Sequence, residues 1–356
     1  MKTTLLALLL LPSSFLFGAS VFTVEDRNIL LNGDPFFVKG ICYNAAPIGQ
    51  TGTEPPYGDY YTDDYLSLTE PDAENLRKMG ANVQRSYGWT PGENHKKYLD
   101  RAYNEGNQSV YMFINRWINP ETDWGDTTAV DQHLQDWVTI ANETKDHPAI
   151  IGYLLGNEHN NEHGNGSNPL FWQAMESIAA AVKTIAPNKL VSVPITDRID
   201  EVTQVDKTME SIDFWAIQVY RSTTFGTFFE EYKQASSKPV VLTEYGYDAF
   251  DNNTGKEYPD NASFTADVVE GMIREIDANS DVCAGGCIFE YKDEWWKSKG
   301  SIEVQDAGGF PAGGMPDKVL NEEWWGIYKV ERNGEQADKL IPRQLYFRLV
   351  KLWNSQ

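Results

Sequence analysis

Cysteine is scarce in this sequence: its 356 residues include three, Cys42, Cys283 and Cys287. Three cysteines allow at most one intramolecular disulfide, and a thiol must be left over. The composition therefore excludes a small fold held together by several disulfides. It leaves the pairing of the three cysteines open.

Positive charge is also in short supply, with 30 lysines and arginines against 52 aspartates and glutamates, for a formal net charge of −22. Nucleic acids and anionic lipids are bound chiefly by clustered lysine and arginine. We therefore expect no nucleic-acid partner and no membrane partner. A neutral substrate fits this charge balance better.

Long hydrophobic runs are missing after the first twenty residues, so no later segment has the roughly 20 uncharged apolar residues of a membrane-spanning helix. Residues 1–20 combine Lys2, the apolar stretch LLALLLLPSSFLF and the small residues 18–20. This pattern predicts a secretory signal peptide over residues 1–20. We expect the mature protein to be secreted and extracellular, or periplasmic if the source is a bacterium.

What the chain does have is a regular alternation of strand-like and helix-like segments. Short runs rich in apolar, β-branched and aromatic residues predict eight strands, at 36–43, 82–87, 109–115, 149–157, 189–195, 213–220, 238–245 and 282–291. Helical patterns such as 72–80 and 169–187 lie between them, and the turn at 32–35 predicts an N-terminal β-hairpin.

Eight such units predict an α/β fold, a single (β/α)8 TIM barrel over residues 21–356, with an open doubly wound sheet as the alternative. No Gly-x-Gly-x-x-Gly follows the first strand and there is no P-loop, so a nucleotide cofactor has little support and we expect no cofactor. The segments 45–69 and 298–323 are rich in glycine and proline, and we expect these insertions on the functional face.

Two glutamates lie where a β/α barrel places its chemistry, at the C-terminal ends of strands. Glu158 ends the fourth predicted strand and Glu244 ends the seventh. Facing each other across the barrel mouth, two carboxylates can cleave a glycosidic bond if one is protonated and the other is ionised. Each alone is equally compatible with a solvated loop, but the pair in this pattern predicts catalytic residues.

Other strand-end and aromatic residues could support this pair. Arg85 could keep a carboxylate nucleophile ionised, and Tyr220 could donate a hydrogen bond to Glu244. Aromatic rings stack on the apolar faces of sugars. The residues that the pattern places near the barrel mouth, some of which could equally be core, are Tyr87, Trp89, Trp117, Trp124, Trp295, Trp296, Trp324 and Trp325.

A histidine motif offers a competing kind of site. His159, Glu162 and His163 fit the His-x-x-Glu-His pattern of some zinc proteases, which requires a helix to bring both histidines to one face. Here a strand precedes the motif and the turn-forming sequence GNGSNP follows it. We therefore expect a polar loop and no metal site.

Several segments of the chain resemble the retaining glycoside hydrolases of clan A, and most closely the β-1,3-glucanosyltransferases and β-1,3-glucanases of family 72. They are VKGICY (38–43), NVQRSY (82–87), GNE (156–158), LTEYGY (242–247) and GGCIFEY (285–291). The resemblance implies Glu158 as acid/base, Glu244 as nucleophile and Asn157 as a ligand of the sugar 2-hydroxyl. It also implies that the donor sites are lined by Tyr43, Arg85, Tyr87, Tyr220 and Tyr291, and we add Trp295 and Trp296 as sugar-binding residues.

The resulting hypothesis is a secreted, monomeric retaining β-glycosidase that acts on polysaccharide or oligosaccharide β-glucan. We expect β-1,3 linkages and a double displacement with hydrolysis or transglycosylation. A β-1,4-glucanase or β-mannanase of the same clan is the first alternative. A barrel that binds glycans without cleaving them is the second.

Overall fold

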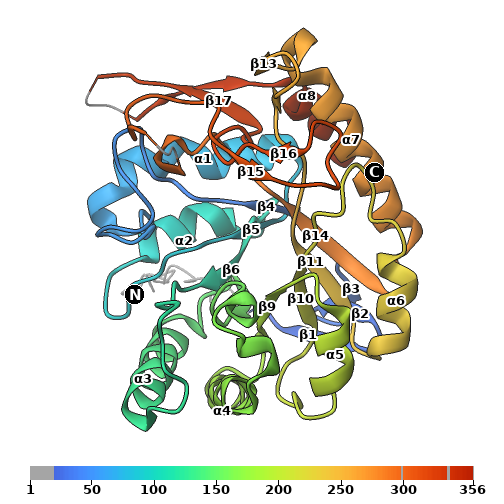
Figure 1. Ribbon diagram of the computed structural model, residues 1–356. Helices are drawn as coiled ribbons and strands as arrows, with labels where there is room; N and C mark the ends of the chain where they lie inside the picture. The colour runs from blue at the N-terminus through green and yellow to red at the C-terminus, as the bar shows by residue number, and fades with distance from the viewer. Residues whose placement is uncertain (1–19, 298–299, 335–336, 356) are drawn as a thin grey trace, which may run out of the picture.

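The centre of the molecule is a parallel sheet with the strand order β8-β7-β6-β5-β4-β14-β11-β10-β9. The computed structural model describes residues 20–297, 300–334 and 337–355, so the predicted signal peptide lies outside the described residues except for Ser20. β8 (Leu190–Ser192) pairs with β7, and β9 (Pro194–Thr196) pairs with β10. Because Val193 alone separates β8 from β9, the two are halves of one strand and the sheet closes into a (β/α)8 barrel (Figure 1).

All eight predicted strands are present; seven are shorter than their sequence runs, and the fifth, made of β8 and β9, ends one residue later than predicted, at Thr196. The other seven barrel strands are β4 (Val38–Cys42), β5 (Val83–Arg85), β6 (Tyr111–Asn115), β7 (Ile150–Leu154), β10 (Trp215–Gln218), β11 (Val240–Tyr245) and β14 (Cys283–Ile288). Nearly every residue in them is buried. Burial on both faces of a parallel sheet explains why their sequences are almost continuously apolar.

Helices cover the outside of the barrel (Figure 1). They are α1 (Leu66–Met79), α2 (Lys96–Tyr103), α3 (Thr127–Thr144), α4 (Pro169–Ile185), α5 (Ile199–Val205), α6 (Phe228–Ala235), α7 (Pro259–Ala278) and α8 (Gln344–Trp353). α1 ends as predicted at Gly80, whose φ of 85° suits glycine, but it begins before the predicted residue 72. Within the described residues, no helix is long and apolar enough to span a bilayer.

The predicted hairpin is part of a small antiparallel sheet of β1 (Phe22–Glu25), β2 (Asn28–Leu31) and β3 (Asp34–Pro35). Its turn uses positive φ angles at Asn32 (54°) and Gly33 (91°). The N–H of Phe22 donates to the carbonyl of Asn188, just before β8, at 2.9 Å. This small sheet therefore lies at the N-terminal end of the barrel, away from the predicted chemistry.

Short β-hairpins lie at the opposite, C-terminal end of the barrel. They are β12 (Phe250–Asp251) with β13 (Lys256–Glu257), β15 (Phe310–Pro311) with β16 (Val319–Leu320), and β17 (Tyr328–Glu331) with β18 (Lys339–Pro342). Single 3-10 turns are η1 (Asp63–Tyr65), η2 (Asn104–Gly106), η3 (His159–Asn161), η4 (Asn165–Ser167) and η5 (Trp295–Lys297). Figure 1 shows the C-terminal hairpins beside the first loops of the chain, so both predicted insertions lie on one face.

Candidate active site

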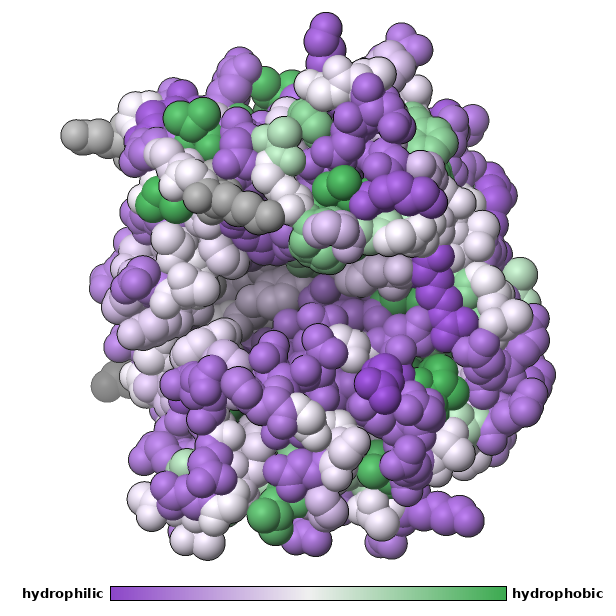
Figure 2. All heavy atoms as spheres, in the orientation of Figure 1, coloured by the Kyte–Doolittle hydropathy of each residue, from purple (hydrophilic) through white to green (hydrophobic). Residues whose placement is uncertain are grey.

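A cavity of about 530 Å³ lies at the C-terminal ends of the barrel strands. Figure 2 shows this face of the molecule crossed by a groove between its upper and lower parts. Both insertions contribute to the wall, with Gly52, Thr53 and Gly58 from the first and Phe310, Leu320 and Glu322 from the second. Both predicted glutamates, Glu158 and Glu244, line this cavity.

Glu244 is held by three hydrogen-bond donors. Its Oε1 accepts from Arg85 Nη1 and from the Tyr87 hydroxyl, both at 2.7 Å, and its Oε2 accepts from the Tyr220 hydroxyl at 2.9 Å. Burial raises the pKa of both tyrosines well above its ordinary value, so they remain protonated donors. A fully buried arginine and two neutral hydroxyls stabilise an anionic, fixed carboxylate.

Glu158 reaches the same cavity from a sharp turn after β7. Gly156 has a φ of +80°, and a Cβ there would lie 2.5 Å from Cδ2 of His159, so glycine is required. Glu158 itself has a φ of 56°, and its N–H donates to the Pro194 carbonyl at 3.0 Å. A non-glycine residue in this conformation is uncommon and is typical of functional sites.

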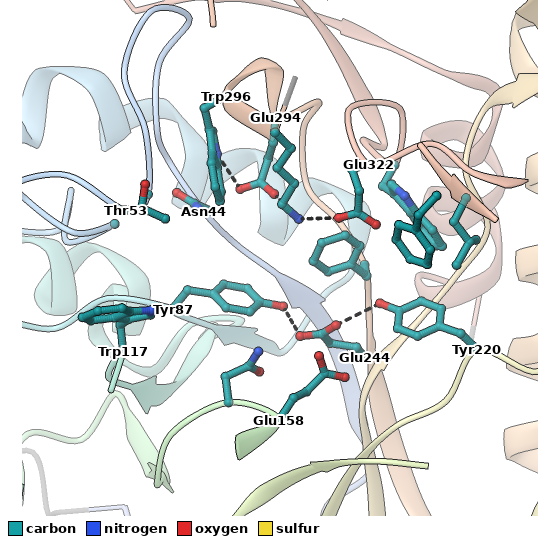
Figure 3. Close-up of a pocket in the computed structure, with 18 of the residues that line it drawn as sticks. Asn44, Thr53, Tyr87, Trp117, Glu158, Tyr220, Glu244, Glu294, Trp296 and Glu322 are labelled. Atoms are coloured by element: carbon teal, nitrogen blue, oxygen red, sulfur yellow. Dashed lines mark hydrogen bonds and ion pairs between the residues drawn. The ribbon is translucent and has the colours of Figure 1, made fainter. Parts of the chain in front are cut away.

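The two carboxyl groups have unlike environments. Burial in the cleft, followed by the nearby Glu244 charge, raises the pKa of Glu158 to about 8. Figure 3 shows Glu158 beside Glu244, whose far side is taken by Tyr87 and Tyr220. One carboxyl is therefore a proton donor at neutral pH and the other is equipped to be an anion, which is the division of roles that glycoside cleavage needs.

Asn157, which precedes Glu158, is connected to the Glu244 network through Arg85. Its Oδ1 accepts hydrogen bonds from Arg85 Nη2 and from Gln218 Nε2, the latter at 2.9 Å, so its amide group is oriented with the nitrogen left for other partners. Gln218 was not singled out in the sequence. It could have been noticed as the one polar residue of the apolar strand WAIQ. In the sheet it lies in register with Glu244.

Two of the predicted sugar ligands are placed elsewhere, and the structure contradicts that prediction. Tyr43 and Tyr291 are fully buried, and their hydroxyls donate to the two oxygens of Asp72 on α1, at 2.7 and 2.9 Å. They point from the strand ends into the layer between sheet and helix. Arg85 is also fully buried and contacts Glu244 behind the cavity wall, so it can position that carboxylate but has no surface for sugar.

The aromatic residues divide into cleft and core. Tyr87, Trp117, Tyr220, Trp296 and Trp325 line the cavity, whereas Trp295, predicted to bind sugar, is not part of its wall. Trp89 and Trp124 are buried core residues, and Trp324 donates its Nε1–H to the Asp306 carbonyl at 2.7 Å. The acidic sequence around Trp295 and Trp296 is the same for both, so it could not predict that only the Trp296 ring lines the cavity.

The histidine motif does not form the helix that its zinc pattern requires. His159 lies in η3 and is buried near Trp124, while His163 has a φ of 44° and contacts Glu121 at 3.1 Å. Burial lowers the pKa of His159 to about 4. Across the described part of the chain, no group of three or more His, Cys, Asp or Glu side chains is arranged to hold a metal ion.

A charged cluster on the cleft wall was also missed by the sequence reasoning. Glu294, Lys297 and Glu322 line the cavity, and Figure 3 shows Glu294 and Glu322 across the cavity from Glu158. These residues come from the motifs DEWWK and NEEWW, whose acidic character was visible in the sequence. The contacts of Lys297 with the two glutamates could not be predicted, because they depend on how two loops fold over each other.

Comparison with known proteins agrees with this geometry. The sequence profile of the glucanosyltransferase family, glycosyl hydrolase family 72, matches residues 19–310. The chain belongs to this family. A 1,3-beta-glucanosyltransferase of Arthroderma benhamiae is 22% identical over 337 residues, covering 87% of this chain and 56% of that protein. This family member thus spans about half the length of the curated relatives it matches.

Solved structures show the fold of this family member in other enzymes. A β-D-glucuronidase of Dictyoglomus thermophilum superposes with a TM-score of 0.66 at 15% identity, over 95% of this chain and 54% of that one. A β-galacturonidase of Eisenbergiella tayi bound to galacturonate gives a TM-score of 0.65 at 14% identity, over 96% of this chain and 54% of that one. At such identity the likeness shows a shared barrel and nothing of the substrate.

Proposed function

We propose that this protein is a secreted retaining β-glycosidase that cleaves β-1,3-glucan by double displacement and passes the glycosyl group to water or to a second sugar. The observation that carries the proposal is the pair Glu158 and Glu244 in one cavity with opposite electrostatic environments. Membership in the glucanosyltransferase family and the 1,3-beta-glucanosyltransferase relative support the choice of linkage.

In the first step, a Glu244 oxygen attacks the anomeric carbon and forms a covalent bond with the sugar. The bond from that carbon to the leaving oxygen breaks, and Glu158 gives its proton to this oxygen. Arg85, Tyr87 and Tyr220 orient Glu244 for attack. The Asn157 amide, fixed by Arg85 and Gln218, is placed to bind the 2-hydroxyl of the reacting sugar.

In the second step, the Glu158 carboxylate takes a proton from water or from a sugar hydroxyl. The resulting oxygen nucleophile attacks the anomeric carbon, and the bond to Glu244 breaks. Each step attacks the anomeric carbon from the face opposite the departing group, so the two successive inversions retain the β configuration. The balance between hydrolysis and transfer depends on how strongly the cleft holds an acceptor sugar against water.

Product analysis tests this function. The purified protein is incubated separately with laminari-, cello- and manno-hexaose, and the chain lengths of the products are read by mass spectrometry. We expect conversion of laminarihexaose alone, with products longer than the substrate showing transfer. Cleavage restricted to the β-1,4-linked series would replace the linkage assignment, and binding without any cleavage would favour a glycan-binding barrel.

A further inference from the structure

The cleft wall carries a basic residue that is enclosed by acidic ones. Lys297 Nζ lies 2.8 Å from Glu294 Oε2 and 3.4 Å from Glu322 Oε2. The same ammonium lies 4.4 Å from the centroid of the Phe289 ring and 5.5 Å from that of Trp296. Glu294 is fixed further, because its Oε1 accepts the Trp296 Nε1–H at 3.1 Å.

These neighbours surround much of the Lys297 ammonium. Two directions around the ammonium are occupied by carboxylates and two by aromatic rings, and 18% of its side chain is exposed. Burial disfavours the charge, but Glu294, Glu322 and Glu290 raise the pKa of Lys297 well above its ordinary value. The ammonium is therefore permanently charged and already neutralised by protein groups.

The charged side chains of the site leave the cleft wall with a net negative charge. Arg85 is matched by Glu244, and Lys297 is matched by one of its two carboxylate partners. Burial raises the pKa of Glu290 well above its ordinary value, so that carboxyl stays protonated, and one negative charge remains from Glu294 and Glu322. Both glutamates line the cavity with Glu158. Carboxylate oxygens accept hydrogen bonds from neutral sugar hydroxyls, whereas they repel a sugar carboxylate.

We propose that Glu294, Lys297 and Glu322 form a charge filter in the cleft, which admits neutral hexose units and rejects uronic acid units. This inference rests on the proposed function and specifies its substrate class. It separates the protein from the β-D-glucuronidase and β-galacturonidase that share its fold, whose names state that they take uronic acids. Glu322, with 32% of its side chain exposed, is the filter residue most accessible to sugar.

The test compares two substrates that differ only in charge: laminarihexaose and laminarihexaose whose C6 hydroxymethyl groups have been oxidised to carboxylates. The quantity measured is the ratio of kcat/KM for the neutral substrate to that for the oxidised one. For the wild type we expect a ratio of at least about 100, since like-charge juxtaposition costs several kcal/mol. Raising the ionic strength should lower the ratio, because salt screens repulsion in an open cleft.

Glu322→Gln removes one charge from the filter and keeps the shape of the side chain. We expect this variant to lower the ratio about tenfold, by improving the oxidised substrate, and to reduce the salt effect. Glu331→Gln is the matched control: it removes the same charge from an exposed pair with Lys339 on the β17–β18 hairpin and should leave the ratio unchanged.

The outcomes separate the two proposals. Efficient cleavage of both substrates by the wild type would overturn the charge filter and leave the proposed function standing. An unchanged ratio in Glu322→Gln, or equal changes in Glu331→Gln, would also overturn it. Cleavage of neither substrate, or of the oxidised one alone, would overturn the proposed function and this inference with it.

Discussion

At the residue scale, the division of roles between the two glutamates predicts the pH dependence. Glu158 has a pKa of about 8, raised by burial and then by Glu244, so it carries its proton below that pH and loses it above. We expect kcat/KM on laminarihexaose to fall about tenfold per pH unit above this value. A pH profile measured under initial-rate conditions checks the position of this basic limb.

The same residue allows a sharper test with Glu158→Gln. This variant should lose the basic limb and almost all activity on natural glycans, whose leaving oxygen needs a proton. Aryl glycosides with an acidic phenol as leaving group need no proton, so their first step should be largely spared. Equal losses on both kinds of substrate would contradict the role of Glu158 as general acid.

Tyr220 tests how strongly the nucleophile depends on its donors. Tyr220→Phe removes the hydroxyl that donates to Glu244 Oε2 at 2.9 Å. A hydrogen bond to a charged group contributes about 1.5 to 3 kcal/mol, so we expect kcat to fall about 10- to 100-fold with little change in KM. Tyr111→Phe is the control, since Tyr111 begins β6 at the other end of the barrel. A loss in KM alone would assign Tyr220 to substrate binding instead.

At the element scale, Asp248 connects the end of β11 to the second insertion. Its Oδ1 accepts the N–H of Phe250 at 3.0 Å, and its Oδ2 accepts the N–H of Asn321 at 3.3 Å, one residue before Glu322. Burial raises the pKa of Asp248 to about 8. This buried carboxyl therefore fixes the loop that carries part of the cleft wall, and it does so mainly in its protonated form at neutral pH.

This linkage predicts a pH-dependent stability. An aspartate in the unfolded chain has a pKa of about 3.9, so between about pH 4 and pH 8 the folded protein binds one more proton at this site. The free energy of unfolding should then fall as pH rises through that range, by up to about 1.4 kcal/mol per unit, and level off above it. In urea unfolding measured across the range, Asp248→Asn should reduce the slope by this amount and leave the part that comes from Glu158, whose pKa is also raised to about 8.

Asp131→Asn is the matched control for this experiment, because Asp131 is exposed on α3. It should keep the wild-type slope. Parallel curves for the wild type and Asp248→Asn would show that the Asp248 carboxyl ionises alike in the folded and unfolded states.

The elements were predictable because their signal is local. Parallel strands buried on both faces must be apolar, so eight runs such as AIIGYLLG and KPVVLTEY identify the barrel, and Gly80 marks the end of a helix. The strand-end rule also located Glu158 and Glu244 at one cavity. Direction was the missing information: Tyr43 and Tyr291 end strands too, but they turn toward α1, where Asp72 accepts their hydroxyls.

The cleft wall was unpredictable for a related reason. The contact between Lys297 and Glu322 joins two loops, and these residues are 25 positions apart in the sequence. The sequence of the loops has no periodicity from which their fold, or the position of Glu294 beside them, could be predicted. Gln218 was missed because it is a single polar residue in a buried strand, and no second polar residue nearby forms a recognisable motif with it. In both cases the neighbours are set by tertiary packing and not by local pattern.

At the scale of the whole molecule, the cleft extends beyond the glutamates between the two insertions. At one end, Tyr57 from the first insertion stacks on Trp117, with ring centroids 6.2 Å apart and planes 8° apart. Both rings are well exposed, at 48% and 42%. Such an open aromatic surface, next to the cavity that Trp117 lines, is suited to stacking on sugars further along a chain.

A chain-length experiment tests this extended surface. Trp117→Ala should raise KM about tenfold for long laminari-oligosaccharides, since an aromatic contact contributes about 0.5 to 1.5 kcal/mol beyond its buried area. The shortest substrate that is still cleaved should be affected less. Phe347→Ala is the control, because Phe347 is equally exposed on α8 and does not line the cavity. An equal effect at every length would place Trp117 beside the reacting sugar.

The central claim, that Glu244 forms a covalent bond with the sugar, is tested most directly by trapping that bond. A laminaribioside with fluorine at C2 of the reacting ring and an acidic leaving group slows the second step more than the first. Peptide mass spectrometry of the labelled protein should find one glycosyl adduct on Glu244 and none in Glu244→Gln. An adduct on Glu290, Glu294 or Glu322, or steady hydrolysis of laminarihexaose with no adduct at all, would contradict the account.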